Sequence, residues 1–333
     1  TKWAEEYIRG GHGKEESKPF YLWLCYGAVH GPFTPAKKNI NHYPNAKVDI
    51  PKDIYPPRNG KPEYSRNKEQ WIPGPDGIPM LKSGKFSGRT VSGKFIHGTD
   101  IHSLERQYHQ GVLAIDEGVG KLIKALKETG QYENTLIVYG ADQGIAWGQK
   151  GFQMKLAPYD GTIRGPLIVS MPSKFPTGRV CSKPVGGADL VPTFFNAARL
   201  DLPWKMHGRD LTPLLTHPER KDWKSPLLLA HTGMSFGEDC DVVIEMKDDP
   251  IYQKQRVPWW ISLRTDRYKY IRNLLPGETE ELYDMRKDPE ELDNLAVQSK
   301  HFVLLRKLRK QTIYELQQTD CSFAQTMPPV KNP

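Results

Sequence analysis

The chain has 333 residues, of which 38% are hydrophobic, and it carries a formal net charge of +8 at pH 7. This length allows one large domain or two, and the 8 Trp, 15 Tyr and 11 Phe exclude an intrinsically disordered chain. No apolar run of about eighteen residues occurs, so we expect no membrane span. The charge favours an anionic partner, either nucleic acid or a sulfated or carboxylated polymer, but no nucleic-acid recognition motif accompanies it, and we expect no nucleic acid.

The four cysteines are widely scattered and lack the short spacings of a cysteine metal site. Their disulfide status stays open; they are Cys25, Cys181, Cys240 and Cys321.

The first strong element is an aromatic and apolar run at residues 19–26, PFYLWLCY, which predicts a buried strand. His30 follows it directly, before Gly31 and Pro32. Because strand ends in open α/β sheets present side chains to the ligand cleft, His30 is a candidate for a side chain in that cleft. A structural histidine is the alternative.

Residues 37–103 are rich in Pro, Gly, Asn and Lys and show little periodicity, which predicts a long irregular insert. Its basic and aromatic residues either line a groove for an anionic polymer or only aid solubility; they are Trp71, Lys82, Lys85, Phe86, Arg89 and Lys94.

Apolar residues then recur at three- and four-residue spacing over residues 104–129, which predicts an amphipathic helix that Gly130 ends. Next, residues 135–139 read as a buried strand, and Asp142 and Gln143 lie just beyond it. Their oxygens suit a hard cation such as Ca²⁺ or Mg²⁺, and Lys155 and Arg164 could meet an anion that such a metal also holds. The alternative is an Asp and a Gln that only cap a turn.

The last third changes character. A helix is expected to start near Pro192, and His207 and Arg209 lie in a turn that either approaches the cleft or is purely structural. Residues 259–271 alternate as a β-hairpin, and residues 302–316 form a basic amphipathic helix that we expect to dock on the protein.

Several of these patterns, in this order, resemble the formylglycine-dependent (type I) sulfatases of the alkaline phosphatase superfamily, over roughly residues 19–296. The matching motifs are Ala28-Val29-His30-Gly31-Pro32, Asp142-Gln143, Lys155, Tyr159-Asp160, Arg164-Gly165-Pro166, Arg264-Thr265 with Tyr268-Lys269-Tyr270, and Glu281-Leu282-Tyr283-Asp284.

The resemblance implies an α/β fold: an alkaline-phosphatase-like mixed sheet sandwiched by helices, with a small C-terminal antiparallel sheet. We divide the chain into residues 1–222, which belong to the large domain, and residues 223–333, the small subdomain. In the family's pattern Asp142 and Gln143 are ligands of one Ca²⁺, Lys155 binds the sulfate and His30 protonates the leaving alcohol. Lys150 stands where many relatives have His, and would add positive charge near the substrate.

The family's nucleophile is a formylglycine made from Cys or Ser in the pattern Cys/Ser-x-Pro/Ala-x-Arg, and no cysteine or serine here fits it. We expect the nucleophile and the remaining metal ligands on an N-terminal portion of the same sulfatase, present either as a second polypeptide or as an amino-terminal extension. The complete enzyme is expected to remove sulfate from a sulfated carbohydrate, and this chain alone to be inactive. The resemblance also implies a secreted or periplasmic protein.

Two other functions stay open. One is a phosphate or phosphonate ester hydrolase of the same superfamily, in which a second metal is often held by an Asp-His pattern; Gln143 in place of that His disfavours it. The other is a non-catalytic sulfated-glycan-binding fragment, which the missing nucleophile would suit.

Overall fold

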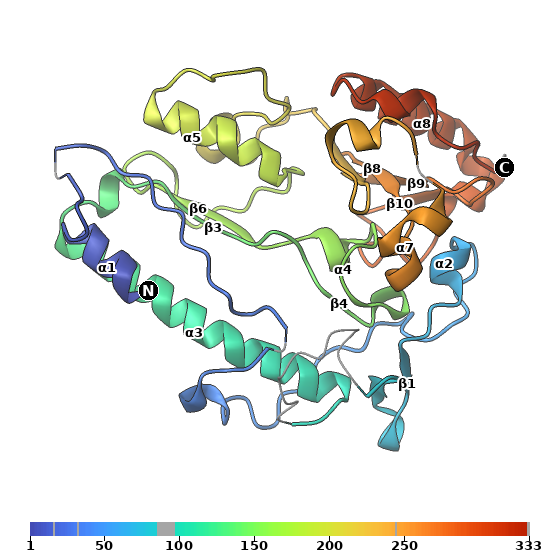
Figure 1. Cartoon of the computed structure of the whole chain (residues 1–333), viewed down its shortest axis with the longest axis horizontal. Coiled ribbons are helices and arrows are strands. Elements are labelled where there is room, and N and C mark those ends of the chain that lie inside the picture. The colour runs from blue at the N-terminus through green and yellow to red at the C-terminus, as the bar shows by residue number, and fades with distance from the viewer. Residues whose placement is uncertain (16, 32, 85–96, 244, 332–333) are drawn as a thin grey trace.

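The computed structural model describes residues 1–15, 17–31, 33–84, 97–243 and 245–331 (Figure 1). An antiparallel pair of strands lies at the centre of its N-terminal part, β3 (Ile137–Gly140) and β6 (Leu167–Ser170), with Val138 opposite Val169. Helices α1 (Lys2–Ile8) and α3 (Ile101–Glu128) lie on one side of this pair and α5 (Leu190–Ala198) on the other (Figure 1). The expected mixed α/β layering is confirmed.

Helix α3 is the longest described element and matches the predicted helix closely. The side chain of Asp100 caps its start by accepting from the backbone N–H of Ser103 at 2.9 Å. Gly130, with φ 69°, follows its end, as the sequence predicted. Its C-terminal apolar residues Ala125 and Leu126 pack against Ile8 of α1.

The predicted strand at residues 19–26 is wrong. The segment is extended but pairs with no described strand, and its side chains alternate between half-buried and exposed. The ring of Phe20 meets Tyr7 of α1 at 6.0 Å, whereas Tyr21 meets Phe194 of α5, also at 6.0 Å. The alternation was hidden because both faces are apolar: Trp23, on the exposed face, is 73% accessible.

The predicted insert is less irregular than expected. It holds α2 (Glu63–Arg66) and the strand pair β1 (Trp71–Pro73) and β2 (Pro79–Leu81). Trp71 does not line a groove: it is 0% exposed, and its indole N–H donates to the carbonyl of Phe152 at 3.0 Å. Lys82 forms an ion pair with Glu69. The other candidates for a basic groove lie outside the described residues: Lys85, Phe86, Arg89 and Lys94.

A compact loop region connects β3 to β6. It contains the strand pair β4 (Ala146–Trp147) and β5 (Gln153–Met154), followed by α4 (Asp160–Ile163). After α5 comes α6 (Thr212–Thr216). Short 3-10 turns lie between these elements, at Lys37–Asn39, Pro75–Gly77, Tyr132–Asn134, Gln149–Gly151 and Gly187–Asp189.

The C-terminal part is a four-stranded antiparallel sheet in the order β10-β9-β8-β7, as expected. Its strands are β7 (Leu227–His231), β8 (Trp260–Arg264), β9 (Tyr268–Asn273) and β10 (Glu281–Asp284). The predicted hairpin is β8–β9. Helix α7 (Pro250–Gln255) precedes it, and α8 (Phe302–Gln317) covers the sheet with Leu305 and Leu308, which confirms the expected docking. Further 3-10 turns are Gly237–Cys240, Met246–Asp248, Leu295–Val297, Ser299–His301 and Ser322–Gln325.

One core crosses the predicted boundary at residue 222. Phe152 and Tyr159 pack in the same cluster as Trp260, Ile271 and Tyr283. The division at residue 222 therefore stays a prediction.

Buried ion pairs also join the two parts. The Lys269 ammonium, with a side chain only 1% exposed, lies 2.8 Å from the Asp160 carboxylate and 2.6 Å from that of Glu291. Burial opposes the charged form of Lys269, but the two carboxylates outweigh it and the pKa is raised. Loss of either partner would leave an uncompensated charge in the core.

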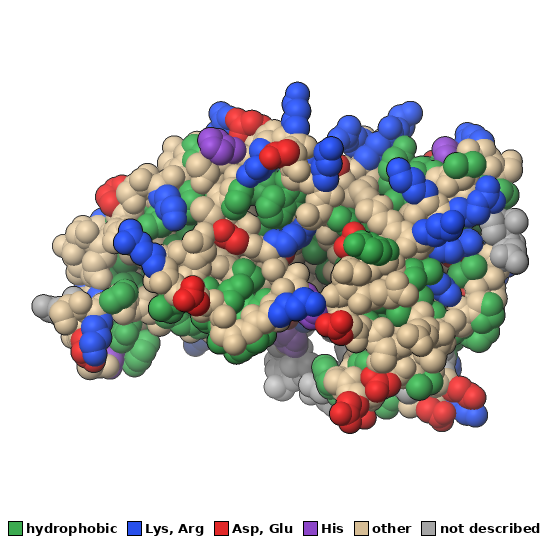
Figure 2. Space-filling model, turned by 90° about the horizontal axis from the view of Figure 1, so that it is seen from above, with side chains coloured by type: hydrophobic (Ala, Val, Ile, Leu, Met, Phe, Trp, Pro, Cys, Tyr) green, Lys and Arg blue, Asp and Glu red, His purple; other side chains and the backbone are tan. Residues whose placement is uncertain are grey.

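Figure 2 views the molecule from the side of α5 and α8. Lys and Arg side chains are spread over this face and apolar side chains lie between them, so the positive charge forms no single groove there. Among the described residues, no helix combines the length and the apolar character that crossing a bilayer requires.

Candidate functional site

A cluster of three aromatic rings holds together the segments that carry the predicted site residues. Phe33 lies 5.5 Å from Tyr108 of α3 and 5.4 Å from Trp147 of β4, and the last two rings are 5.6 Å apart. Phe33 shortly follows His30, and Trp147 shortly follows Asp142 and Gln143. The cluster therefore fixes the His30 loop and the loop after β3 on the same part of α3.

His30 is exposed, and its Nδ1 lies 3.1 Å from the carbonyl oxygen of Gly31. The neighbouring residue Val29 packs onto Gly111 of α3, where a Cβ would lie 2.7 Å from the Val29 side chain. Only glycine allows this close approach, so the sequence holds the base of the His30 loop firmly while its imidazole stays accessible.

Asp142 and Gln143 follow β3, as predicted. Asp142 is exposed, and the Gln143 amide donates to its carboxylate at 3.4 Å. Gly144 lets this loop pack against the end of α4, because a Cβ there would lie 2.7 Å from the carbonyl oxygen of Arg164. Arg164, the second predicted cation, is thereby beside the Asp142 loop.

Lys155 follows β5 and is half-buried. Leu156, the next residue, has φ 83°, a strained value for a side chain of this kind. The carbonyl of Leu156 accepts a hydrogen bond from the Trp260 indole at 2.8 Å, and Ala157 beyond it is fully buried. Within the described part of the chain, no carboxylate or carbonyl partner is found for the Lys155 ammonium.

The side-chain oxygens of Asp142 and Gln143 are of the type that a hard cation binds, but they are too few to complete its coordination. A carboxylate and a carboxamide oxygen suit Ca²⁺, which takes about six to eight oxygen ligands. Among the described residues, no group of three or more His, Cys, Asp or Glu is arranged to hold a metal. The two residues could thus supply only part of a calcium site.

Lys150, predicted to approach the substrate, faces the protein interior. Its side chain is 1% exposed, and its ammonium lies 3.0 Å from the Asp53 carboxylate and 2.5 Å from the carbonyl of Glu290. This placement favours a structural role for Lys150, and its role in substrate binding stays a prediction.

Arg209 and His207 have different surroundings. Two guanidinium nitrogens of Arg209 donate hydrogen bonds to the Asp189 carboxylate, at 3.0 and 2.8 Å. The guanidinium also stacks on the Trp223 ring, 5.1 Å from its centroid. These contacts favour the structural reading of Arg209. His207 is exposed, and its predicted role is also untested.

Sequence reasoning missed the residues that position Lys155 and the Asp142 loop. Gly144 and Trp260 carry out this positioning through backbone contacts. No sequence signal marks Leu156, because an ordinary leucine adopts the positive φ there. Gly144, directly after the Asp-Gln pair, was a visible signal for a close backbone approach.

Comparison with family models gives two matches. A model described as "Sulfatase" matches residues 1–200, and one described as "N-sulphoglucosamine sulphohydrolase, C-terminal" matches residues 251–319.

Individual proteins agree with these matches. The chain is 26% identical over 322 residues to an arylsulfatase of Clostridium perfringens, covering 95% of this chain and 58% of that protein. It is 26% identical over 358 residues to an N-acetylglucosamine-6-O-sulfatase of Bacteroides thetaiotaomicron, covering 96% and 60%. A solved protein in complex with its substrate D-glucosamine-2-N,6-O-disulfate superposes with a TM-score of 0.71 at 21% identity, covering 96% of this chain and 70% of that one. The chain thus spans less than two thirds of the length of these two curated relatives.

Proposed function

The chain belongs to the sulfatase family, and from this premise we propose that the whole protein is a sulfuric ester hydrolase that removes sulfate from a sulfated carbohydrate. The observation that carries the proposal is Lys155, a half-buried cation without a partner among the described residues, fixed by Leu156 and Trp260. The names of two of the similar proteins, an N-acetylglucosamine-6-O-sulfatase and a protein in complex with its substrate D-glucosamine-2-N,6-O-disulfate, support the choice of a sugar ester.

Each site residue then has a role that its chemistry allows. The Lys155 ammonium would neutralise charge on the sulfuryl oxygens, a stabilisation that grows as the transition state forms. The accessible imidazole of His30 would give a proton to the leaving alcohol. Asp142 and Gln143 would hold one Ca²⁺, which when bound supplies further positive charge to the sulfuryl group.

We place the nucleophile, a formylglycine, on a further portion of the same sulfatase. The curated relatives are longer than this chain, which covers 58% and 60% of them. Large apolar side chains are also exposed in this part of the chain: Trp23 is 73% and Ile168 of β6 is 62% exposed. Such side chains suit burial against further strands of the same protein. A secreted or periplasmic location is proposed from the family alone.

The experiment is sulfate release by the full-length protein, measured by ion chromatography. The substrates are a 6-O-sulfated N-acetylglucosamine oligosaccharide and, in parallel, a phenyl phosphonate monoester. The proposal expects inorganic sulfate from the sugar, loss of turnover with a chelator and recovery with Ca²⁺. Turnover of the phosphonate with no sulfate release would favour the phosphonate hydrolase instead, and binding of the sugar without turnover would favour a glycan-binding protein.

A further inference from the structure

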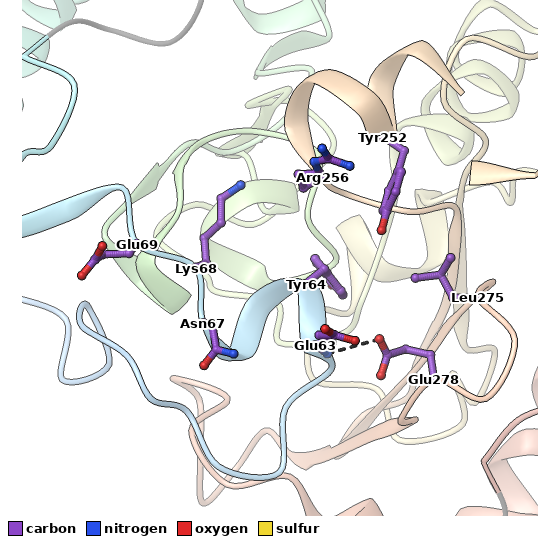
Figure 3. A pocket seen from close by; sticks show the side chains of 9 residues that line it. All are labelled: Glu63, Tyr64, Asn67, Lys68, Glu69, Tyr252, Arg256, Leu275 and Glu278. Carbon is purple, nitrogen blue, oxygen red and sulfur yellow. Dashed lines mark hydrogen bonds between the residues drawn. The ribbon is translucent and has the colours of Figure 1, made fainter. Parts of the chain in front are cut away.

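A pocket of about 380 Å³ lies between α2 and α7, apart from the predicted catalytic residues (Figure 3). Its walls include Tyr64 of α2, Tyr252 of α7 and Leu275 after β9. The volume lies in the range of small-molecule sites. None of His30, Asp142, Gln143 and Lys155 lines it.

Two cations meet at one end of this pocket. Figure 3 shows the side chains of Lys68 and Arg256 side by side there, whereas Glu63 and Glu278 lie at the other end. The Lys68 ammonium donates to the carbonyl of Gln255 at 2.9 Å and lies over the Phe152 ring at 5.0 Å. The Arg256 guanidinium lies 5.7 Å from the Tyr252 ring.

No carboxylate among the described residues pairs with either of the two cations. In the described part of the chain neither Lys68 nor Arg256 forms an ion pair, and Glu69, which also lines the pocket, is paired with Lys82. Burial, and then the charge of Arg256, lower the pKa of Lys68 to about 8, and no carboxylate opposes the shift. A bound anion would relieve this repulsion.

Arg256 also occupies a backbone position that favours glycine. It ends α7 with φ 58° and ψ 31°, the left-handed conformation in which glycine carries no steric cost. An arginine there has a steric cost that a glycine would not have, and its described contacts are the Tyr252 ring and a backbone hydrogen bond to the Tyr252 carbonyl.

We infer that this pocket is a second anion-binding site, in which Lys68 and Arg256 hold a sulfate or carboxylate group of one sugar unit of a glycan. The remaining walls suit such a sugar: Tyr252 and Leu275 offer apolar surface to its ring, and the carboxylates at the far end accept from its hydroxyls. The inference rests on the proposal that the substrate is a sulfated glycan. The pocket adjoins the catalytic segment, because the Phe152 ring under Lys68 belongs to the stretch that leads to Lys155.

The test measures glycan affinity by titration calorimetry in the full-length protein. Arg256→Gly removes the guanidinium while suiting the left-handed backbone, so it is expected to fold. Lys68→Gln is the second variant, and Lys254→Ala, on the exposed side of α7, is the matched control. The probes are a sulfated tetrasaccharide, a carboxylated tetrasaccharide without sulfate, and a neutral tetrasaccharide.

We expect Arg256→Gly and Lys68→Gln each to weaken binding of the sulfated tetrasaccharide by about tenfold, as for loss of one charge-assisted hydrogen bond. Lys254→Ala should bind like the wild type, and the neutral probe should not distinguish the variants. If the pocket variants also lose affinity for the carboxylated probe, the site accepts both sulfate and carboxylate groups. If they lose affinity for the sulfated probe alone, the site is specific for sulfate. Wild-type affinity for the sulfated probe in both pocket variants would overturn the inference.

The proposed function is tested separately, by wild-type sulfate release from 6-O-sulfated N-acetylglucosamine, a single sugar unit. If this sugar is cleaved and both pocket variants keep full glycan affinity, only the second site fails. If no sulfate ester is cleaved but the variants lose affinity, only the proposed reaction fails.

Discussion

The indole N–H of Trp260 donates to the carbonyl of Leu156 at 2.8 Å, and Leu156 is the residue directly after Lys155. This bond ties the predicted sulfate-binding lysine to the first strand of the β8–β9 hairpin. The positive φ of Leu156 is held in place by the surrounding core rather than by its own preference. The C-terminal sheet therefore contacts the candidate site through the backbone next to Lys155.

Trp260→Phe should separate this positioning from core packing. The change keeps an aromatic ring but leaves the Leu156 carbonyl without its donor, which costs about 1 kcal/mol of stability. We expect sulfate release by the full-length protein to fall about tenfold, mainly in kcat. Trp223→Phe is the matched control, because the Trp223 indole nitrogen is buried without a hydrogen-bond partner in the described structure. Equal activity in the two variants would refute the positioning role.

Gly144→Ala tests the close packing of the Asp142 loop. The new Cβ would meet the backbone oxygens of Arg164 at 2.7 Å and Gly161 at 3.0 Å, so the loop must move. We expect a loss of about 1–3 kcal/mol in stability, together with weaker Ca²⁺ dependence of activity. Gly120→Ala, on the exposed side of α3 with no atom near its Cβ, should instead stabilise by about 0.5–1 kcal/mol. Unimpaired activity and stability in Gly144→Ala would show that the loop tolerates a side chain.

Lys269→Met should be among the most destabilising single changes in the chain. It would leave the buried carboxylate of Glu291 and the half-buried carboxylate of Asp160 without their shared cation, at a cost of about 3–5 kcal/mol. Lys52→Met, which breaks the exposed pair with Glu290, should change the free energy of unfolding very little. Urea unfolding of both variants makes the comparison, and a similar small effect in each would show that the buried network is dispensable.

Lys61 gives a pH prediction with a defined sign. Burial is the main cause that lowers its pKa from 10.5 to about 8, against the opposing charge of Glu281. Between about pH 8 and pH 10.5 the unfolded chain therefore binds more protons at this site than the folded chain, and stability rises with pH there. Relative to Lys61→Met, which cannot titrate, the wild type should gain on the order of 2 kcal/mol from pH 7.5 to pH 10. A constant difference across this range would contradict the lowered pKa.

The sequence predicted the elements with a clear period and a clear end. Helix α3 followed from apolar residues at three- and four-residue spacing and from Gly130, and the β8–β9 hairpin from the alternation over residues 259–271. The strand prediction at residues 19–26 failed because apolar side chains lie on both faces of the segment. The sequence could therefore not show that one face stays exposed. The prediction that Trp71 could line a groove also failed, because its hydrogen-bond partner, the carbonyl of Phe152, is remote in sequence.

Site residues could be predicted from the sequence only where they directly follow the end of a helix or strand. Asp142 and Gln143 were found because they directly follow β3. The surroundings of Lys150 could not be found, because its partners Asp53 and Glu290 come from distant segments and only the tertiary fold brings them together. The pocket at Lys68 and Arg256 was invisible for the same reason, since no local pattern joins α2 to α7.

The central claim is that Lys155 binds the sulfate in a sulfuric ester hydrolase. The most direct measurement is kcat/KM for sulfate release by the full-length protein carrying Lys155→Ala, compared with Lys174→Ala, a surface lysine beside Phe175. The account predicts a fall of about 10²–10³-fold for Lys155→Ala, typical of losing a group that stabilises transition-state charge, and no change for Lys174→Ala. Sulfate release by Lys155→Ala at the wild-type rate would contradict it.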